Sequence, residues 1–364
     1  MKRPYYIFSS GKLVRKQNTL FFEPYDDDRE EERKKLVGAH DEADRQLLSE
    51  AGELNDGYDT TGKRVIPIQD VDALLFFGEV NFNSRMLQFL NQNKIPAHIF
   101  NYYGYHSGTY YPNEYLLSGF LLVDQVKHYQ RNSRRMVIAR RLIKGASSNM
   151  LRNLKYYHDR TADLTELIKK IEFWREQLDA IDDVHELLGT EGNIRRTYYR
   201  AFPAILGDRF DFHHRVKNPP DNAVNALISF GNAMVYTACL TEIYKTQLSP
   251  LISYLHEPGE RRFSLALDLA EIFKPLLADR VIFTCLNQER IGPDDFDKEL
   301  NYCYLKPEGR KTFVKAFEQK MTTTIKHRKL KRKVSYRRLI RLECYKLVKH
   351  LTGAEDYEPF KAWW

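Results

Sequence analysis

The segment that decides the fold class is residues 102–113, which reads Tyr102-Tyr103-Gly104-Tyr105-His106-Ser107-Gly108-Thr109-Tyr110-Tyr111-Pro112-Asn113. Its glycines, proline and asparagine favour turns, so we interpret the segment as a linker. The period of the hydrophobic residues changes across it, from about two residues before it to about 3.6 residues after it. The sequence therefore predicts an α+β protein, with a small β-rich N-terminal domain (1–101) and a large all-α C-terminal domain (114–364).

Short runs of β-branched and aromatic residues predict the strands of the N-terminal domain. Residues 5–8 and 12–14 flank a Ser-Ser-Gly turn and are interpreted as a hairpin, closed by a strand at 19–22. Similar runs follow at 65–68, 73–77 and 97–100. Residues 24–62 interrupt this pattern with charged residues and glycine, so we interpret them as an insertion in the sheet.

The charge of the chain is unevenly distributed. From Glu23 to Asp56 there are thirteen acidic and five basic side chains, although the whole chain carries +8. The remaining residues are therefore strongly basic, which favours a nucleic-acid partner. The four cysteines have no paired spacing, and no signal peptide or bilayer-length apolar run is evident, so we expect a cytoplasmic protein without membrane contact.

The C-terminal domain contains a helix with two acids in apolar surroundings. Ser264 and Pro275 predict its start and stop, which places Asp268 and Glu271 three residues apart on one face. Burying two neighbouring carboxylates is costly, and a bound cation relieves that cost. The alternative is an exposed stripe on which these acids pair with Lys274 or Arg261.

Two other residues have little weight by themselves. His256 precedes a Pro-Gly turn, and a single His is more often a satisfied loop or core residue than a ligand. Glu191 is expected in the first turn of a helix, where it would simply stabilise the helix dipole. A helix is also expected over 164–188, and Pro219-Pro220-Asp221 predicts the start of another, with Asp221 as its N-cap.

Three motifs together resemble those of a known family. They are Gly189-Thr190-Glu191-Gly192, Leu255-His256-Glu257-Pro258 and the helix Ser264–Pro275, in this order. This set resembles the motifs of the CRISPR spacer-acquisition integrase, the larger of the two core CRISPR adaptation proteins. The resemblance extends to Asn222, Asn225 and the helix at 335–340, and covers nearly the whole chain apart from 24–62.

The resemblance implies a divalent-metal site. In the family a Glu, a His and a later Asp or Glu bind the ion, and by type and order these are Glu191, His256 and Glu271. Asp268 is then a further catalytic acid that supports the site or a second ion. Two carboxylates and an imidazole suit Mg²⁺ or Mn²⁺, whereas structural Zn²⁺ prefers more Cys or His ligands.

The resemblance also implies the reaction and the partners. In prokaryotic antiviral defence, the 3′-hydroxyl of a captured double-stranded DNA fragment attacks the repeat boundary of a CRISPR array by transesterification. With water as the nucleophile, the same site would act as an endonuclease. The family works as a homodimer, and a small dimeric companion protein bridges two such dimers.

Several basic residues are candidates for contacts to DNA phosphates. They are Arg195, Arg261, Arg262, Lys274, Lys331, Arg332 and Lys333. The last three belong to a run at 326–341 with nine Lys or Arg in sixteen residues, which also fits a merely solvated face. The alternative function is a non-catalytic, basic helical nucleic-acid-binding protein, which would bind DNA without divalent ions.

Overall fold

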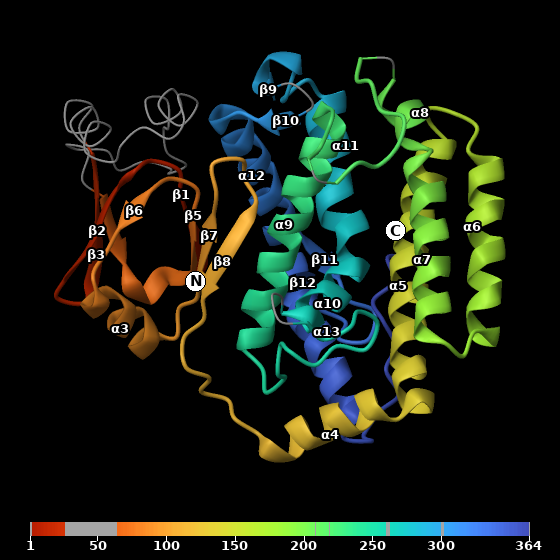
Figure 1. Ribbon diagram of the computed structural model, residues 1–364, viewed down its shortest axis with the longest axis horizontal. Helices are drawn as coiled ribbons and strands as arrows, with labels where there is room; N and C mark the ends of the chain where they lie inside the picture. Colours follow the sequence, from red (N-terminus) through yellow and green to blue (C-terminus); the bar gives the residue numbers. More distant parts are fainter. Residues whose placement is uncertain are drawn as a thin grey trace. The chain divides into compact units, whose positions relative to one another are not determined.

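The computed structural model describes residues 2–25, 64–207, 209–217, 219–259, 263–299 and 302–363 (Figure 1). The chain divides into two compact units, described separately below. The first contains Met1–Tyr115, Asp295–Asp297 and Tyr304–Lys315, and the second contains Leu116–Asp294, Lys298–Cys303 and Ala316–Trp364. Apart from its first two residues, the insertion predicted at 24–62 lies outside the described residues.

The first unit contains a sheet of order β1-β5-β7-β8. Its strands are β1 (Arg3–Ile7), β5 (Val71–Phe76), β7 (Ala97–Phe100) and β8 (His106–Tyr110). The first three are parallel, and β8 is antiparallel to β7. Every residue of β5 is buried, as expected of a central strand in a parallel sheet. Helix α3 (Ser84–Asn93) joins β5 to β7 and begins where the Asn83 side chain accepts the N–H of Met86.

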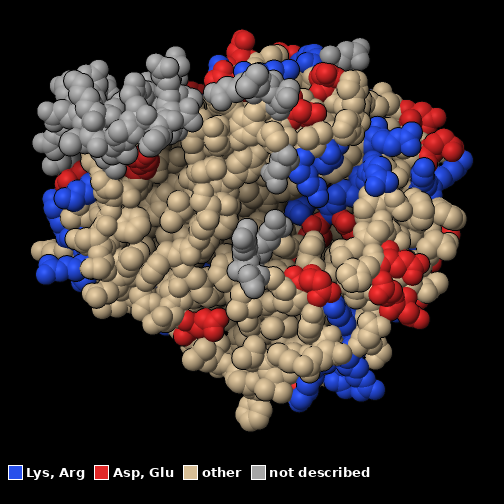
Figure 2. Space-filling view, viewed as in Figure 1, with Lys and Arg blue, Asp and Glu red and all other residues tan. Residues whose placement is uncertain are grey.

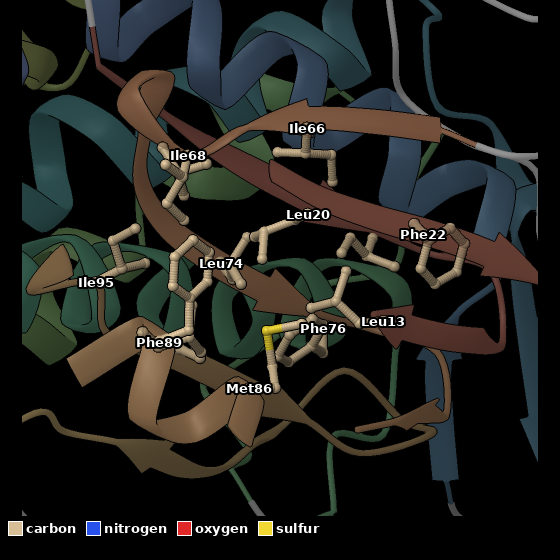
Figure 3. Packing of buried hydrophobic residues seen from close by; sticks show 14 residues of the cluster. Leu13, Leu20, Phe22, Ile66, Ile68, Leu74, Phe76, Met86, Phe89 and Ile95 are labelled. Carbon is tan, nitrogen blue, oxygen red and sulfur yellow. The ribbon is translucent and has the colours of Figure 1, made fainter. Parts of the chain in front are cut away.

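A second sheet of the same unit has the order β4-β3-β2-β6. Its strands are β2 (Gly11–Lys16), β3 (Thr19–Pro24), β4 (Arg64–Pro67) and β6 (Val80–Asn81), and the 3₁₀ turn η1 (Ile68–Asp70) follows β4. One hydrophobic cluster joins the two sheets and α3. In Figure 3, Leu13, Leu20 and Phe22 of this sheet lie near Phe76 of β5 and Met86 of α3. This cluster is the core of the first unit.

The hairpin predicted between residues 5–8 and 12–14 is wrong. β1 pairs with β5, where Tyr5 lies opposite Leu74, and β2 pairs with β3. At Gly11 the chain enters the second sheet, and the Gly11 amide donates to Glu79 O at 2.9 Å. The local alternation that identifies a strand does not identify its partner, and the partner of β1 comes much later in the chain.

Part of the predicted linker is also a strand. Residues 106–110 form β8 and pair with β7, so the first unit continues to Tyr115. The turn between these strands is held by the Asn101 side chain, which accepts the N–H groups of Tyr103 and Tyr105 at 3.1 and 2.9 Å. The predicted linker therefore belongs to the first unit and begins with a hairpin turn, and the chain passes to the second unit only after Tyr115.

The second unit is mostly helical, which confirms the predicted α+β class. The helices that begin in it are α4 (Gly119–Gln130), α5 (Asn132–His158), α6 (Thr165–Gln177), α7 (Val184–Tyr199), α8 (Phe202–Leu206), α9 (Ala223–Tyr244), α10 (Ser264–Lys274), α11 (Arg280–Asn287) and α13 (Tyr336–Leu351). Helix α12 (Pro307–Thr322) has residues in both units. The region predicted as all-α also contains strands in the described residues: β9 (Phe296–Glu299) pairs with β10 (Tyr302–Leu305), and β11 (Thr324–Lys326) with β12 (Lys333–Ser335).

Two predicted helix boundaries are wrong. The helix expected over 164–188 ends at Gln177, and after a 3₁₀ turn, η2 (Leu178–Ala180), α7 begins at Val184 with Asp183 as its N-cap. Glu191 therefore lies within α7, away from its first turn. The N-cap of α9 is Asn222, whose side chain accepts the N–H of Asn225 at 2.9 Å, and Asp221 instead accepts from the Asn225 side chain.

Helix α9 is the central helix of the second unit. Its length and mean hydropathy of 1.4 over 18 residues would suffice to cross a membrane, but 67% of that stretch is buried inside the protein. It contacts α10, α11 and α13. Packing within this unit accounts for its apolar composition.

Helix α10 is held by two asparagines of α5. Pro275 has no N–H to donate to the preceding turn, and the backbone continues as a π-helix, η3 (Pro275–Asp279). The side chain of Asn149 donates to Ile272 O at 2.9 Å, and that of Asn153 donates to Pro275 O at 2.7 Å. Both asparagines are fully buried. They satisfy backbone carbonyls at the irregular end of α10 and fix this helix against α5.

The C-terminal tail packs against the same two helices. Asn149 also donates to Phe360 O at 3.2 Å and accepts the N–H of Ala362 at 2.8 Å. The ring of Phe360 stacks on Phe273 of α10, with centroids 6.1 Å apart. The buried carboxylate of Glu343 on α13 accepts the N–H of Phe360. The tail is therefore part of the packing that fixes α10.

Candidate metal centre

Asp268 organises the loop that precedes α10. Its carboxylate is fully buried, and Oδ2 accepts the N–H groups of Tyr254 and Leu255 at 2.7 and 3.0 Å. Oδ1 accepts the backbone N–H of His256 at 3.0 Å and its ring Nδ1 at 2.8 Å. We assign the ring proton to Nδ1 because this nitrogen faces a carboxylate. Nε2 is then the nitrogen of His256 with a lone pair for a metal.

Two acids from different helices share one guanidinium group. Arg195 of α7 donates from Nε to Glu191 Oε1 at 2.7 Å, and its Nη2 lies 2.6 Å from the same oxygen. The same Nη2 donates to Oε2 of Glu271 on α10. Lys274 Nζ donates to the other oxygen of Glu271 at 2.6 Å. Since the side chains of Glu191 and Glu271 are only 17% and 7% exposed, this is a largely buried cluster of charges.

The surrounding charges shift the pKa values of this cluster. Burial acts to raise the pKa of Glu191, but the charge and hydrogen bond of Arg195, followed by the charge of Lys274, outweigh it and lower this pKa. Burial, followed by repulsion from Arg195, lowers the pKa of Lys274 to about 7. Glu191 is therefore ionised at neutral pH and suited to bind a cation.

The predicted ligands have the right chemistry for a divalent ion, although Arg195 now lies between two of them. Among the described residues, no group of three His, Cys, Asp or Glu side chains is placed to hold a metal ion. However, Glu191 and Glu271 converge on one cationic nitrogen, and Nδ1 of the His256 ring contacts the Asp268 carboxylate. Oxygen-rich sets of this kind suit Mg²⁺ or Mn²⁺. That these three residues bind a metal stays a prediction.

The exposed acidic stripe considered as the alternative for α10 is wrong. Asp268 is fully buried and Glu271 is 5% exposed. Glu271 does pair with Lys274, as that alternative held, but the pair is buried. Asp268 pairs with no Lys or Arg among the described residues and binds the His256 loop. The two acids therefore have different roles: Asp268 orients the imidazole ring of His256, and Glu271 pairs with Arg195 and Lys274.

The predicted phosphate contacts fall into three groups. Arg195 and Lys274 are engaged by the buried carboxylates. Arg261 and Arg262 lie outside the described residues. The remaining three, Lys331, Arg332 and Lys333, are exposed in the hairpin formed by β11 and β12. Of the predicted phosphate contacts in the described part of the chain, these three hairpin residues are the exposed ones.

Two features of the site were missed from the sequence. Arg195 was considered only as a phosphate contact, although its i,i+4 spacing from Glu191 could have indicated the pair. Lys217, in the loop before α9, was not considered, and no sequence signal marks it. Burial lowers its pKa, and repulsion from Arg195, Arg215 and Lys274 lowers it further. Lys217 therefore belongs to the electrostatic surroundings of the cluster.

Basic side chains are concentrated on one part of the second unit. In the space-filling view, Lys and Arg gather over the region of α7 and α8, with Asp and Glu side chains beside them (Figure 2). A surface rich in positive charge attracts a polyanion.

Comparisons with known proteins agree with the motif resemblance. The family model for the CRISPR associated protein Cas1 matches residues 41–319. The CRISPR-associated endonuclease Cas1 3 of Thermodesulfovibrio yellowstonii is 46% identical over the full length of both chains. A solved Cas1 protein from Thermotoga maritima is 37% identical, with a TM-score of 0.81 over 98% of this chain and 99% of its own. A casposase bound to an integration product has a TM-score of 0.81 at 18% identity, over 99% of this chain and 93% of its own, which shows the fold alone.

The matched range 41–319 and the full-length match to the Thermodesulfovibrio protein both span the positions of the three motifs, and the fold agrees with that of the Thermotoga protein. The resemblance first seen in the motifs around Glu191, His256 and Glu271 is confirmed. The chain belongs to the CRISPR associated protein Cas1 family.

Proposed function

We propose that this chain is a divalent-metal-dependent DNA endonuclease and integrase, which inserts DNA fragments into a CRISPR array. The observation that carries the proposal is the buried pair Glu191–Glu271, together with His256 held by Asp268. Burying two carboxylates on one cation costs free energy that ordinary core packing avoids, and such arrangements are typical of functional sites. The name of the Thermodesulfovibrio relative, an endonuclease, also supports it.

Each site residue has a distinct task in this proposal. Glu191, Glu271 and Nε2 of His256 would hold Mg²⁺ or Mn²⁺, which when bound neutralises charge on phosphate oxygens and lowers the pKa of an attacking hydroxyl. Asp268 keeps the proton of His256 on Nδ1 and so keeps Nε2 available. Lys274 holds the second oxygen of Glu271.

The proposed reaction is exchange of one phosphodiester for another. The 3′-oxygen of the incoming DNA fragment forms a bond to phosphorus at the repeat boundary, and the bond to the leaving 3′-oxygen breaks. The attacking hydroxyl gives its proton to solvent, and the leaving 3′-oxygen takes one up to become a hydroxyl. No ATP is needed because the number of ester bonds is unchanged. With water as the nucleophile, the same displacement gives endonuclease cleavage.

The proposed partners are double-stranded DNA, a second copy of this chain and a small dimeric companion protein that bridges two such dimers. The exposed hairpin with Lys331, Arg332 and Lys333 supports contact with the DNA backbone. The homodimer and the companion rest on the family resemblance. Sedimentation at micromolar concentration should give a dimer, and a stable monomer would contradict this part of the proposal.

The second candidate function is a non-catalytic, DNA-binding protein. It is favoured by one observation, namely that Arg195 and Lys274 already neutralise the acidic pair. In such a protein the cluster would be structural, and DNA binding would be independent of divalent ions.

Single substitutions distinguish the two candidates. Glu191→Ala, His256→Ala and Glu271→Ala should each abolish Mn²⁺- or Mg²⁺-dependent cleavage and strand transfer, with an unchanged far-UV circular dichroism spectrum. Glu186→Ala, at an exposed acid on the same helix as Glu191, is the matched control and should retain activity. Turnover by the wild-type protein in EDTA, or an active triple variant, would refute metal-dependent catalysis.

A further inference from the structure

We propose that Arg195 is an internal cation that competes with the divalent ion for Glu191 and Glu271, and that it moves to Asp279 when the ion binds. This inference rests on the proposed function, because it concerns the same carboxylates. It assigns to Arg195 a positioning and regulatory role in place of the predicted phosphate contact.

The first argument is the shared nitrogen. Nη2 of Arg195 contacts Glu191 from its own helix and Glu271 from α10, so one cationic atom joins both predicted acidic ligands. The Arg195 side chain is only 15% exposed. A guanidinium in this position links α7 to α10 and holds both carboxylates near each other without a metal.

The second argument is the balance of charge. Glu191 and Glu271 carry two negative charges, and Arg195 and Lys274 oppose them with two cationic groups. Adding a divalent ion to this buried cluster leaves an excess of positive charge, which is costly where water is scarce. Departure of Arg195 frees both carboxylates, because it contacts both, whereas Lys274 donates to Glu271.

The third argument is that a second acceptor exists for Arg195. Asp279, at the end of the π-helix, is 3% exposed, and its Oδ1 accepts no hydrogen bond from the described residues. The charge of Arg195 is the largest influence that opposes the effect of burial on Asp279. Arg195 also interacts with the Tyr199 hydroxyl, one turn further along α7. A buried carboxyl oxygen without a donor is thus available to a displaced guanidinium.

In this proposal Arg195 has two alternative partners. With Glu191 and Glu271, Arg195 stabilises the acidic pair in the absence of metal. With Asp279, it would satisfy the orphaned oxygen and release the pair. Metal affinity is then set by the difference between these arrangements, and each residue that favours one of them should shift that affinity in a defined direction.

The test is a double-mutant cycle that measures binding of Mn²⁺ alone, by the loss of the free-ion signal in electron paramagnetic resonance. Arg195→Gln should bind Mn²⁺ at least about tenfold more tightly, because a nearby positive charge is removed. Asp279→Asn should bind it more weakly by about threefold or more in the wild-type background. In the Arg195→Gln background, Asp279→Asn should not change Mn²⁺ affinity, because the guanidinium that Asp279 would accept is absent.

Arg196→Gln is the matched control, since Arg196 is the next residue of the same helix and is exposed. It should leave Mn²⁺ affinity unchanged. Circular dichroism of each variant shows whether it is folded. The milder Arg195→Lys variant, which keeps a positive charge, should bind Mn²⁺ with intermediate affinity. If Arg195→Gln binds Mn²⁺ no better than wild type, competition is refuted. If the Asp279→Asn effect is the same in both backgrounds, the move to Asp279 is refuted.

Failure of the proposed function gives a different pattern. In that case Glu191→Ala would bind Mn²⁺ as tightly as wild type, and the pair would not be a metal site. If Glu191→Ala loses Mn²⁺ binding but Arg195→Gln gains none, the metal site stands and only the competing role of Arg195 fails.

Discussion

The substitution Asp268→Asn tests what the buried carboxylate of Asp268 contributes to the stability of the protein and to metal binding by His256. The carboxylate of Asp268 accepts the N–H groups of Tyr254 and Leu255 on one oxygen, and the backbone and ring N–H groups of His256 on the other. An amide has one oxygen and one NH₂ group, so in either orientation the NH₂ group faces two donors. Two hydrogen bonds to a buried, charged acceptor are therefore lost.

The expected effect on stability follows from that count. A hydrogen bond to a charged group contributes about 1.5–3 kcal/mol, so the free energy of unfolding should fall by about 3–6 kcal/mol. His256 also loses the carboxylate that orients it, and changes behind a metal-binding imidazole typically weaken metal affinity by about 10- to 100-fold. Mn²⁺ binding to Asp268→Asn should weaken by that factor, and strand transfer should fall with it.

Urea unfolding and Mn²⁺ titration of the same samples measure both effects. Glu257→Gln is the control, because Glu257 lies in the same loop but is 48% exposed and pairs with Arg135. It should change the free energy of unfolding by less than about 1 kcal/mol. If Asp268→Asn behaves like this control in both measurements, the proposed role of Asp268 is wrong.

Two further predictions concern pH and salt. Burial raises the pKa of Asp279 from 3.8 to about 7, so the stability that this shift provides is fully present below pH 3.8 and is lost as pH rises to 7. With about 1.36 kcal/mol per pKa unit, the free energy of unfolding should fall by about 4 kcal/mol over this range. The Asp279→Asn variant should not show this fall. If the free energy of unfolding depends on pH in the same way in both proteins, the raised pKa is not that of Asp279. Replacing Lys331, Arg332 and Lys333 together with Ala should reduce the slope of log affinity against log salt by about 2.7, since each phosphate contact contributes about 0.9, and should weaken binding to all duplexes alike. An unchanged slope would identify this run as a solvated surface.

The sequence predicted those parts of the site that depend on local signals. Helix α10 was expected between Ser264 and Pro275 and spans Ser264–Lys274, because Pro275 and the apolar spacing are strong local features. The prediction that Glu191 lies in the first turn of its helix was wrong. The N-cap Asp183 follows a short 3₁₀ turn, which the periodic pattern does not distinguish from a continuous helix.

Features that depend on the meeting of distant segments could not be predicted. The pairing of β1 with β5 is one example, since alternation identifies a strand and not its neighbour. The bond from Arg195 to Glu271 is another, because it requires α7 and α10 to lie together. The four hydrogen bonds of Asp268 likewise appear only when the loop before α10 folds over it.

The C-terminal tail ties the order of synthesis to the assembly of this site. Asn149 bonds to Ile272 on one side and to Phe360 and Ala362 on the other, and more than two hundred residues separate it from the tail. Since Phe360 and Ala362 follow α10 in the chain, this helix lacks their support until they have been synthesised. A partly made or truncated chain carries Glu271 on a helix that is still incompletely packed. The surroundings of Glu271 are thus completed late in synthesis, after the helices of the second unit have been made.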